Sequence, residues 1–340
     1  MRSLVLILLA AMPLSGQVPS VHYTRIEIAA GNDSATWVPV ATINGARPGK
    51  TVAILSGAHG TEYASILAAQ RVIPRIDPTR LTGTVIVVPL INRASFERMR
   101  VHMNPVDEKS MNGNYPGKAT GTQTERVLEA IARDVIAKAD VIIDLHNGDI
   151  DENLRPYSYW TRTGNAVQDS TALALCKAMG LDHIIVRNVD ITNPASTRSA
   201  SGYSLSLGKV AIVAEAGRWA RTDAADVRAL EDGVLRVLGQ LGMLPSSPLP
   251  PRHITWLGED ARLRADGDVM WTSLVDRGVL VKGGQVIGYT SDYWGRKLTD
   301  VKSPKDGMVT FIRSVPSAWS GSTLAAVSDV VAKPEPWKKP

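Results

Sequence analysis

The hydrophobic positions of the chain follow two alternating patterns between about residue 45 and residue 242. Short β-branched runs bounded by turn residues predict strands, and runs with helical spacing of apolar residues predict helices. Strands are expected at 51–57, 83–92, 140–148, 182–188 and 209–217, and helices at 62–76, 122–139, 169–180 and 223–242. This alternation predicts an α/β domain with a largely parallel sheet and helices on both of its faces.

A change of pattern divides the chain near residue 247. The stretch 244–252 is rich in Pro and Ser and is typical of a linker. Helical spacing then disappears, and short β-type runs alternate with Gly, Asp-Gly and Pro-Lys-Asp-Gly turns. The sequence therefore predicts an α/β domain over residues 17–247, followed by a small all-β domain over residues 250–332.

The first residues have the pattern of a secretory signal peptide. One Arg precedes an apolar run from Leu4 to Leu14, and the small residues Ser15 and Gly16 follow it. We expect a signal peptide at residues 1–16 and an exported, periplasmic or secreted protein, with no membrane association after cleavage. An uncleaved anchor or a buried first strand is the alternative. The single cysteine, Cys176, excludes an intrachain disulfide and is expected to be a small buried hydrophobic residue.

The composition is that of an ordinary globular protein, with 44% hydrophobic and 21% charged residues. The formal net charge of +5 is spread along the chain without a Lys/Arg block, which disfavours a nucleic-acid partner. A homo-oligomer remains open.

Three predicted strands end in residues suited to metal or acid–base chemistry. His59 and Glu62 follow the first strand, His146 ends the strand at 140–148, and Glu215 closes the strand at 209–217. The carboxyl ends of strands in an open α/β sheet face a common crevice, so these side chains are expected to converge. Two imidazoles and one carboxylate suit a catalytic zinc, and Glu215 would then be the general base. Asp144, two residues before His146, would orient that imidazole.

Each of these residues also has an ordinary interpretation, because a lone His at a strand end is usually a surface or core residue. The joint pattern favours the metal site. The remaining histidines have no such partners and are interpreted as structural or surface residues: His22, His102, His183 and His253.

With these residues assembled, the chain resembles the succinylglutamate desuccinylase/aspartoacylase family, deacylases of the zinc carboxypeptidase clan. The matching segments are Gly57–Glu62, Asn92–Phe96 with Arg100, Asp107–Gly117, Asp144–His146 and Glu215–Gly217, and the similarity extends over roughly residues 45 to 330. The resemblance implies a zinc-exopeptidase-like mixed sheet and one Zn²⁺ per chain. It also implies that Arg100 steadies the oxyanion and that Asn112 binds substrate.

One position departs from the family pattern. Gly113 occupies the place where the family usually has an arginine that grips a substrate carboxylate. Glycine cannot make that bidentate contact. Either the substrate lacks the carboxylate, or another cation binds it, with Arg155, Arg198 and Arg218 as candidates.

The sequence thus predicts a zinc-dependent amidohydrolase that deacylates a small N-acyl compound. One alternative is an exported zinc carboxypeptidase, and another is a non-catalytic binding protein that keeps the fold. The C-terminal β domain is expected to shape access to the site. The polar segment 187–204 is expected to be a long loop near the cleft, either a lid or disordered.

Overall fold

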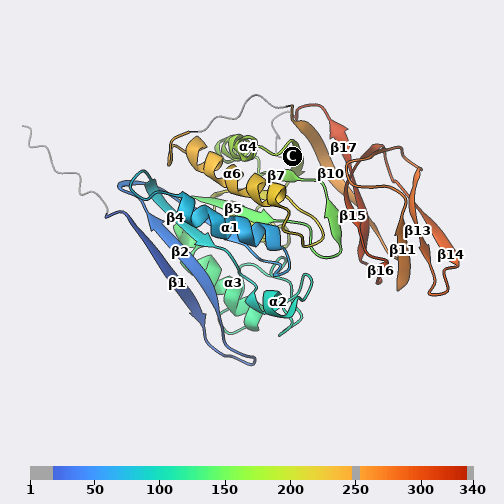
Figure 1. Cartoon of the computed structure of the whole chain (residues 1–340), viewed down its shortest axis with the longest axis horizontal. Helices are drawn as coiled ribbons and strands as arrows, with labels where there is room; N and C mark the ends of the chain where they lie inside the picture. The colour runs from blue at the N-terminus through green and yellow to red at the C-terminus, as the bar shows by residue number, and fades with distance from the viewer. Residues whose placement is uncertain (1–17, 247–252, 335–340) are drawn as a thin grey trace, which may run out of the picture.

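A computed structural model describes residues 18–246 and 253–334 (Figure 1). The predicted signal peptide and most of the predicted linker lie outside the described residues, so both stay predictions. No helix within the described ranges has the length and apolar character needed to cross a membrane.

A mixed sheet of 13 strands is the main element of the fold (Figure 1). Its centre is parallel: β4 (Thr82–Val88), β3 (Arg47–Ser56), β5 (Val141–His146) and β9 (Val210–Glu215) lie side by side. Antiparallel strands extend it on one side through β2 (Thr36–Asn44) and β1 (Ser20–Ile28). On the other side, β7 (Tyr157–Arg162) joins β9, and β8 (His183–Asn188) joins β7.

Helices cover both faces of this sheet, as the sequence predicts. One face packs against α1 (Tyr63–Arg75), α4 (Ala166–Met179) and α6 (Ala224–Gln240). The other packs against α3 (Gln123–Asp134), the short helix η1 (Ile136–Lys138) and α5 (Ala200–Ser206). Strand β3 contributes side chains to the hydrophobic cores on both faces of the sheet. Val52 and Ile54 face the first core, and Ala53 and Leu55 face the second. Its buried apolar run follows from this two-sided burial.

Every described element after residue 252 is a strand, which agrees with the predicted β region. That region continues the main sheet rather than only following it in sequence. β10 (Thr255–Arg264) pairs in parallel with β8, and β17 (Thr323–Val331), β15 (Gly307–Arg313) and β12 (Leu280–Val281) extend from it. The short β6 (Glu152–Leu154) pairs with β15. A separate four-stranded sheet contains β14 (Lys297–Lys302), β13 (Val286–Ser291), β11 (Val269–Ser273) and β16 (Ser317–Ala318).

The segment 187–204 is more ordered than the predicted loop or lid. It includes the end of β8, the short helix η2 (Pro194–Thr197) and the start of α5. Ser199 begins α5 as an N-cap whose side chain accepts a hydrogen bond from the Gly202 backbone, and buried Ala200 and Leu205 pack on the sheet. The start of α5 was not predicted from the polar composition, because the amino acids that cap helices are the same ones that form loops.

Two local predictions, a Thr-x-x-Glu helix start at 122–125 and a buried Cys176, are confirmed. Glu125 accepts a hydrogen bond from the backbone N–H of Thr122 at 2.9 Å, as expected at the start of α3. Cys176 is buried. The short helix α2 (Arg93–Arg98) was not predicted, and the strand expected at 83–92 ends at Val88.

Candidate active site

Two imidazoles converge on one carboxylate at the carboxyl ends of β3 and β5. His59 Nδ1 lies 2.5 Å from Glu62 Oε1, and His146 Nδ1 lies 2.9 Å from Glu62 Oε2. Glu62 and His146 are buried, whereas His59 is partly open to solvent. The three residues predicted as ligands therefore meet in space, and the same ring nitrogen of each histidine faces the shared carboxylate.

The loop after β3 has this shape because its sequence requires it. Gly57 has φ +66°, a conformation that favours glycine, and turns the chain out of the strand. A Cβ at Gly60 would lie 2.2 Å from the backbone nitrogen of Phe96, so only glycine fits there. The side-chain amide of Asn92 donates to the carbonyl of Ala58 at 3.3 Å. These contacts hold the loop that carries His59 against the start of α2.

The donor set fits a divalent metal ion such as zinc. The three candidate ligand atoms lie within 4.8 Å of one another. Burial acts to raise the pKa of Glu62, but His146 and His59 outweigh it and hold the pKa of Glu62 well below its usual range. The carboxylate is therefore ionised, as a ligand must be. Asp144 lies 3.3 Å from His146 Nε2, the ring nitrogen that faces away from Glu62. For Nδ1 to bind a metal, the imidazole proton must lie on Nε2, the side of the ring that faces Asp144.

Glu215 lies beside the triad at the end of β9. It is the register partner of His146 on the neighbouring strand. Its Oε2 is buried and has no hydrogen-bond partner within the described ranges. Burial raises the pKa of Glu215 to about 8; His146 opposes the rise, and Glu62, Glu152 and Asp144 add to it. A carboxyl group with this pKa can both accept and return a proton near neutral pH.

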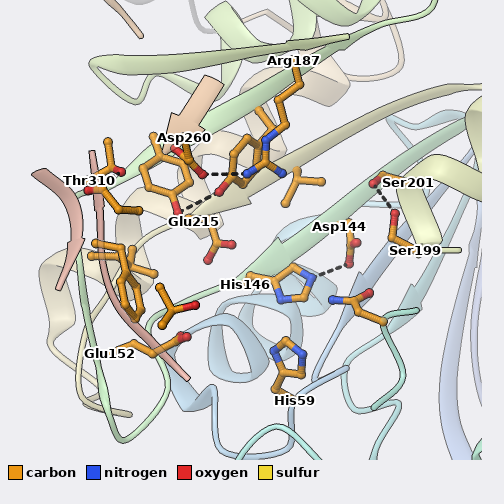
Figure 2. A pocket seen from close by; sticks show the side chains of 18 of the residues that line it. His59, Asp144, His146, Glu152, Arg187, Ser199, Ser201, Glu215, Asp260 and Thr310 are labelled. Carbon is orange, nitrogen blue, oxygen red and sulfur yellow. Dashed lines mark hydrogen bonds and ion pairs between the residues drawn. The ribbon is translucent and has the colours of Figure 1, made fainter. Parts of the chain in front are cut away.

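All of these residues line one cavity of about 380 Å³ (Figure 2). Its other walls come from the strand β7, from the loop before α5 and from the C-terminal strands β10, β15 and β17. The lining residues are His59, Glu62, Asn112, Asp144, His146, Glu152, Leu154, Tyr157, Tyr159, Arg187, Ser199, Ser201, Val213, Glu215, Asp260, Arg262, Thr310, Phe311, Thr323 and Ala326. A cavity of this size suits a small molecule.

The structure brings one further predicted residue into the cavity and leaves four outside its lining, Arg100, Arg155, Arg198 and Arg218. Asn112 lines the cavity, and its Oδ1 is buried with no hydrogen-bond partner among the described residues. Arg100 has a half-exposed side chain that pairs with Glu108 at 2.5 Å. The role predicted for Arg100 at the reacting carbonyl therefore has no support in this geometry.

The three arginines considered for the substrate carboxylate also have different surroundings. Arg198 lines a separate pocket. Arg155 pairs with Asp182 at 2.9 Å. The Arg218 guanidinium lies 4.3 Å from the ring centre of Trp219. None of the three is part of the cavity lining.

Sequence reasoning missed His102, which it interpreted as structural or surface. The His102 ring lies edge-on to that of His59, with centroids 5.5 Å apart. Its Nε2 is 3.1 Å from Asp151 and 3.9 Å from Glu152, and its Nδ1 is 3.3 Å from Asp149. Burial lowers the pKa of His102, but the three carboxylates outweigh burial and raise that pKa to about 9. The acidic run at 149–152 was the available signal for a cationic partner.

Sequence reasoning also missed the charged residues of β8 and β10 that line the cavity. Arg187 ends the apolar strand β8, and Asp260 and Arg262 lie on β10. A charged residue at the end of an apolar strand, as in 183–188, was the available signal for Arg187. No sequence pattern joins β8 to β10, because the two strands pair across the linker.

The fold and the site together define an α/β protein with a candidate metal centre at the carboxyl edge of its sheet. Residues 48–241 match the succinylglutamate desuccinylase/aspartoacylase catalytic domain, which is more than half of the chain. The chain belongs to this family of deacylases, hydrolases that act on carbon–nitrogen bonds.

Individual relatives are similar over nearly the whole chain. The N-alpha-acetyl-L-2,4-diaminobutyric acid deacetylase of Halomonas elongata is 24% identical over 325 residues, covering 93% of each chain. The product-bound ectoine utilization protein EutE (DoeB) from Ruegeria pomeroyi is 20% identical and superposes with a TM-score of 0.81 over 94% of this chain and 97% of that one. A Rhodobacter sphaeroides succinylglutamate desuccinylase/aspartoacylase is 21% identical, with a TM-score of 0.81 over 95% and 99% of the two chains. Both structures show the same fold.

Proposed function

We propose that this protein is a zinc-dependent deacylase that hydrolyses the amide bond of a small N-acylated compound. The observation that carries the proposal is the convergence of His59, Glu62 and His146 in one cavity with Glu215. The Halomonas elongata relative, named for deacetylation of an N-acetylated amino acid, supports a substrate of this size and chemistry.

The candidate ligands of the zinc are His59 Nδ1, His146 Nδ1 and the Glu62 carboxylate. When bound, zinc acts as a Lewis acid on the acyl carbonyl and lowers the pKa of water. Glu215 accepts the proton of the attacking water and then delivers it to the leaving nitrogen, which its raised pKa permits. Asn112 Oδ1 is free to accept a hydrogen bond from a substrate N–H.

The carboxypeptidase alternative is less well supported by the shape of the site. The lining of the cavity of about 380 Å³ includes Thr310 and Phe311 of β15 and Ala326 of β17. A small acylated compound fills such a space, whereas an extended peptide needs an open groove on the acyl side of the bond. The non-catalytic alternative leaves the buried Glu215 carboxyl group beside the triad, without a hydrogen-bond partner among the described residues, unexplained.

The deciding experiment measures zinc content and hydrolysis together. Wild type and His146→Ala are compared on a panel of N-acetyl and N-succinyl amino acids, simple amides and short peptides. We expect one zinc per wild-type chain and release of amine from a small N-acyl substrate, with zinc and activity both lost in the variant. His22→Ala is the matched control, because His22 is exposed and its side chain contacts Ser20, far from the site. A wild-type protein without zinc, or a variant that keeps full activity, contradicts the proposal.

A further inference from the structure

The cavity lacks a cation at the position where the family pattern predicts one. Gly113 has φ +94°, and a Cβ placed there would meet nothing within 4 Å. Arg100, Arg155 and Arg218 are all outside the cavity lining. Among the described residues that line the cavity, the guanidinium groups are those of Arg187 and Arg262.

Arg187 is held on two sides. Its Nη2 donates to Asp260 Oδ2 at 2.9 Å, and its guanidinium carbon lies 3.6 Å from the ring centre of Tyr159. A guanidinium has five N–H donors in a fixed plane, and Asp260 takes one of them. The side chain keeps 31% of its surface accessible while lining the cavity. Its orientation is therefore fixed while other donors remain open to a ligand.

The charges around Arg187 leave an excess of positive charge at this end of the cavity. Asp260 is buried, accepts a hydrogen bond from Ser328 at 2.7 Å and has Arg262 Nη2 at 3.8 Å as well as Arg187. Two guanidinium groups thus share one carboxylate. The triad end of the same cavity is acidic, because Glu152 and Glu215 line it. In the view of Figure 2, Glu215 lies between Arg187 and His59.

We propose that Arg187, oriented by Asp260 and Tyr159, binds a carboxylate of the substrate. The substrate of the proposed deacylase is then an N-acylated compound that carries a carboxylate, with its amide at the triad and its carboxylate at the junction of β8 and β10. An Arg–carboxylate contact supplies the bidentate geometry that Gly113 cannot. This assignment rests on the proposed function. It places the arginine that binds the substrate carboxylate on strand β8 rather than on the 107–117 loop.

Matched substrate pairs test this assignment. N-acetyl amino acids are compared with their neutral carboxamides, and N-succinyl amines with N-propionyl amines, so that the carboxylate is removed from the amine side or from the acyl side. We expect Arg187→Met to lower kcat/KM for the carboxylate member of one pair by about 10- to 150-fold, the effect of losing a charged hydrogen bond. The neutral member should change by less than about threefold on the same scale.

Two further variants serve as controls for Arg187→Met. Arg187→Met leaves Asp260 buried without its main partner, so the double variant Arg187→Met/Asp260→Asn removes both charges and should show the same selective loss. Arg155→Met is the matched control, because Arg155 pairs with Asp182 outside the cavity, and it should affect both members of each pair equally. An equal effect of Arg187→Met on both members, or none, overturns the proposal.

A binding measurement separates failure of this proposal from failure of the proposed function. Calorimetry compares N-acetylglycine with N-acetylglycinamide on the zinc-loaded protein. A wild-type preference for the carboxylate that disappears in Arg187→Met supports the assignment even if no substrate is turned over. Turnover of N-acyl substrates with no difference between wild type and Arg187→Met refutes the assignment and leaves the deacylase intact.

Discussion

Replacing Glu215 with Gln tests the acid–base role at the centre of the proposed chemistry. Gln has nearly the shape of Glu but cannot accept and return a proton. General acid–base catalysis contributes about 100- to 10,000-fold, so kcat should fall by that factor, or by about 2.7–5.4 kcal/mol of transition-state stabilisation. KM should change little, because the amide keeps the size and hydrogen-bonding reach of the carboxylate.

The structure also predicts what the substitution leaves unchanged. Glu215 is not one of the candidate ligand residues, so zinc content should remain one per chain. Its pKa is raised by burial, and a carboxyl group with a raised folded-state pKa costs stability at any pH above its unfolded pKa of about 4.3. Gln removes that cost, so the melting temperature should not fall.

Glu152→Gln is the matched control. Glu152 lines the same cavity, and burial raises its pKa as well, but its Oε2 already accepts the backbone N–H of Asp149 at 3.0 Å. We expect Glu152→Gln to lower kcat by less than about tenfold. The assay is release of free amine from the best substrate in the panel, beside zinc analysis and thermal melting. Near-normal turnover by zinc-loaded Glu215→Gln would remove Glu215 from this role, and a large loss in Glu152→Gln alone would transfer the role to that residue.

Four further outcomes follow from the geometry. A chelator should lower the melting temperature and added zinc should restore it, because a ligand at 1,000 times its Kd stabilises the folded protein by about 4 kcal/mol. A melting temperature that changes with neither the chelator nor zinc argues against a bound metal. Asp144→Asn should weaken zinc binding by about 10- to 100-fold in a chelator competition titration, since it loosens the neighbouring imidazole. Arg100→Met should lower kcat by less than about tenfold, because its side chain pairs with Glu108 at the surface; a loss of about 100- to 1,000-fold would place it at the oxyanion instead. The hydrogen bond from His183 lowers the pKa of Asp182 to about 2, so its stabilisation is present above the unfolded pKa of about 4 and is lost as the pH falls through about 2. Asp182→Asn should therefore reduce the dependence of the urea midpoint on pH in that interval.

The strands that the sequence predicts best are those whose two faces are both buried. Strands β5 and β9 read as continuous apolar runs because helices cover both faces of the central sheet. The hairpin of β1 and β2 was not predicted: β1 lies at the edge and is mostly exposed, so polar residues dominate it. Strand β7 was missed because its aromatic and polar run, 157–162, has no clear period.

The convergence of the candidate ligands His59, Glu62 and His146 was predictable for a geometric reason. Residues at the carboxyl ends of neighbouring parallel strands must share one edge, and β3, β5 and β9 are such neighbours. Arg100 follows a helix, and the turn after α2 decides where its side chain points. Met99 has φ +48°, which ends α2 in a left-handed turn, and the guanidinium then meets Glu108. Motif spacing carries no information about such a turn.

The residues that could not be predicted all depend on one long-range pairing. Strand β10 adds to β8 in parallel, with Trp256 opposite Ile184 and Leu257 opposite Ile185. This pairing brings β10 beside β8, and Asp260 Oδ2 lies 2.9 Å from Arg187 Nη2, although three helices, β9 and the predicted linker separate the two residues in sequence. The candidate metal ligands and Glu215 therefore belong to the part of the chain that matches the family domain, whereas Asp260, which pairs with Arg187, comes from the β region beyond it. Since strands pair by backbone hydrogen bonds, the side chains of β10 that lie outside the core, such as Arg262, can change without loss of the sheet. With Arg187 binding the substrate as proposed, selection among substrates can vary at β10 while the residues of the triad stay the same.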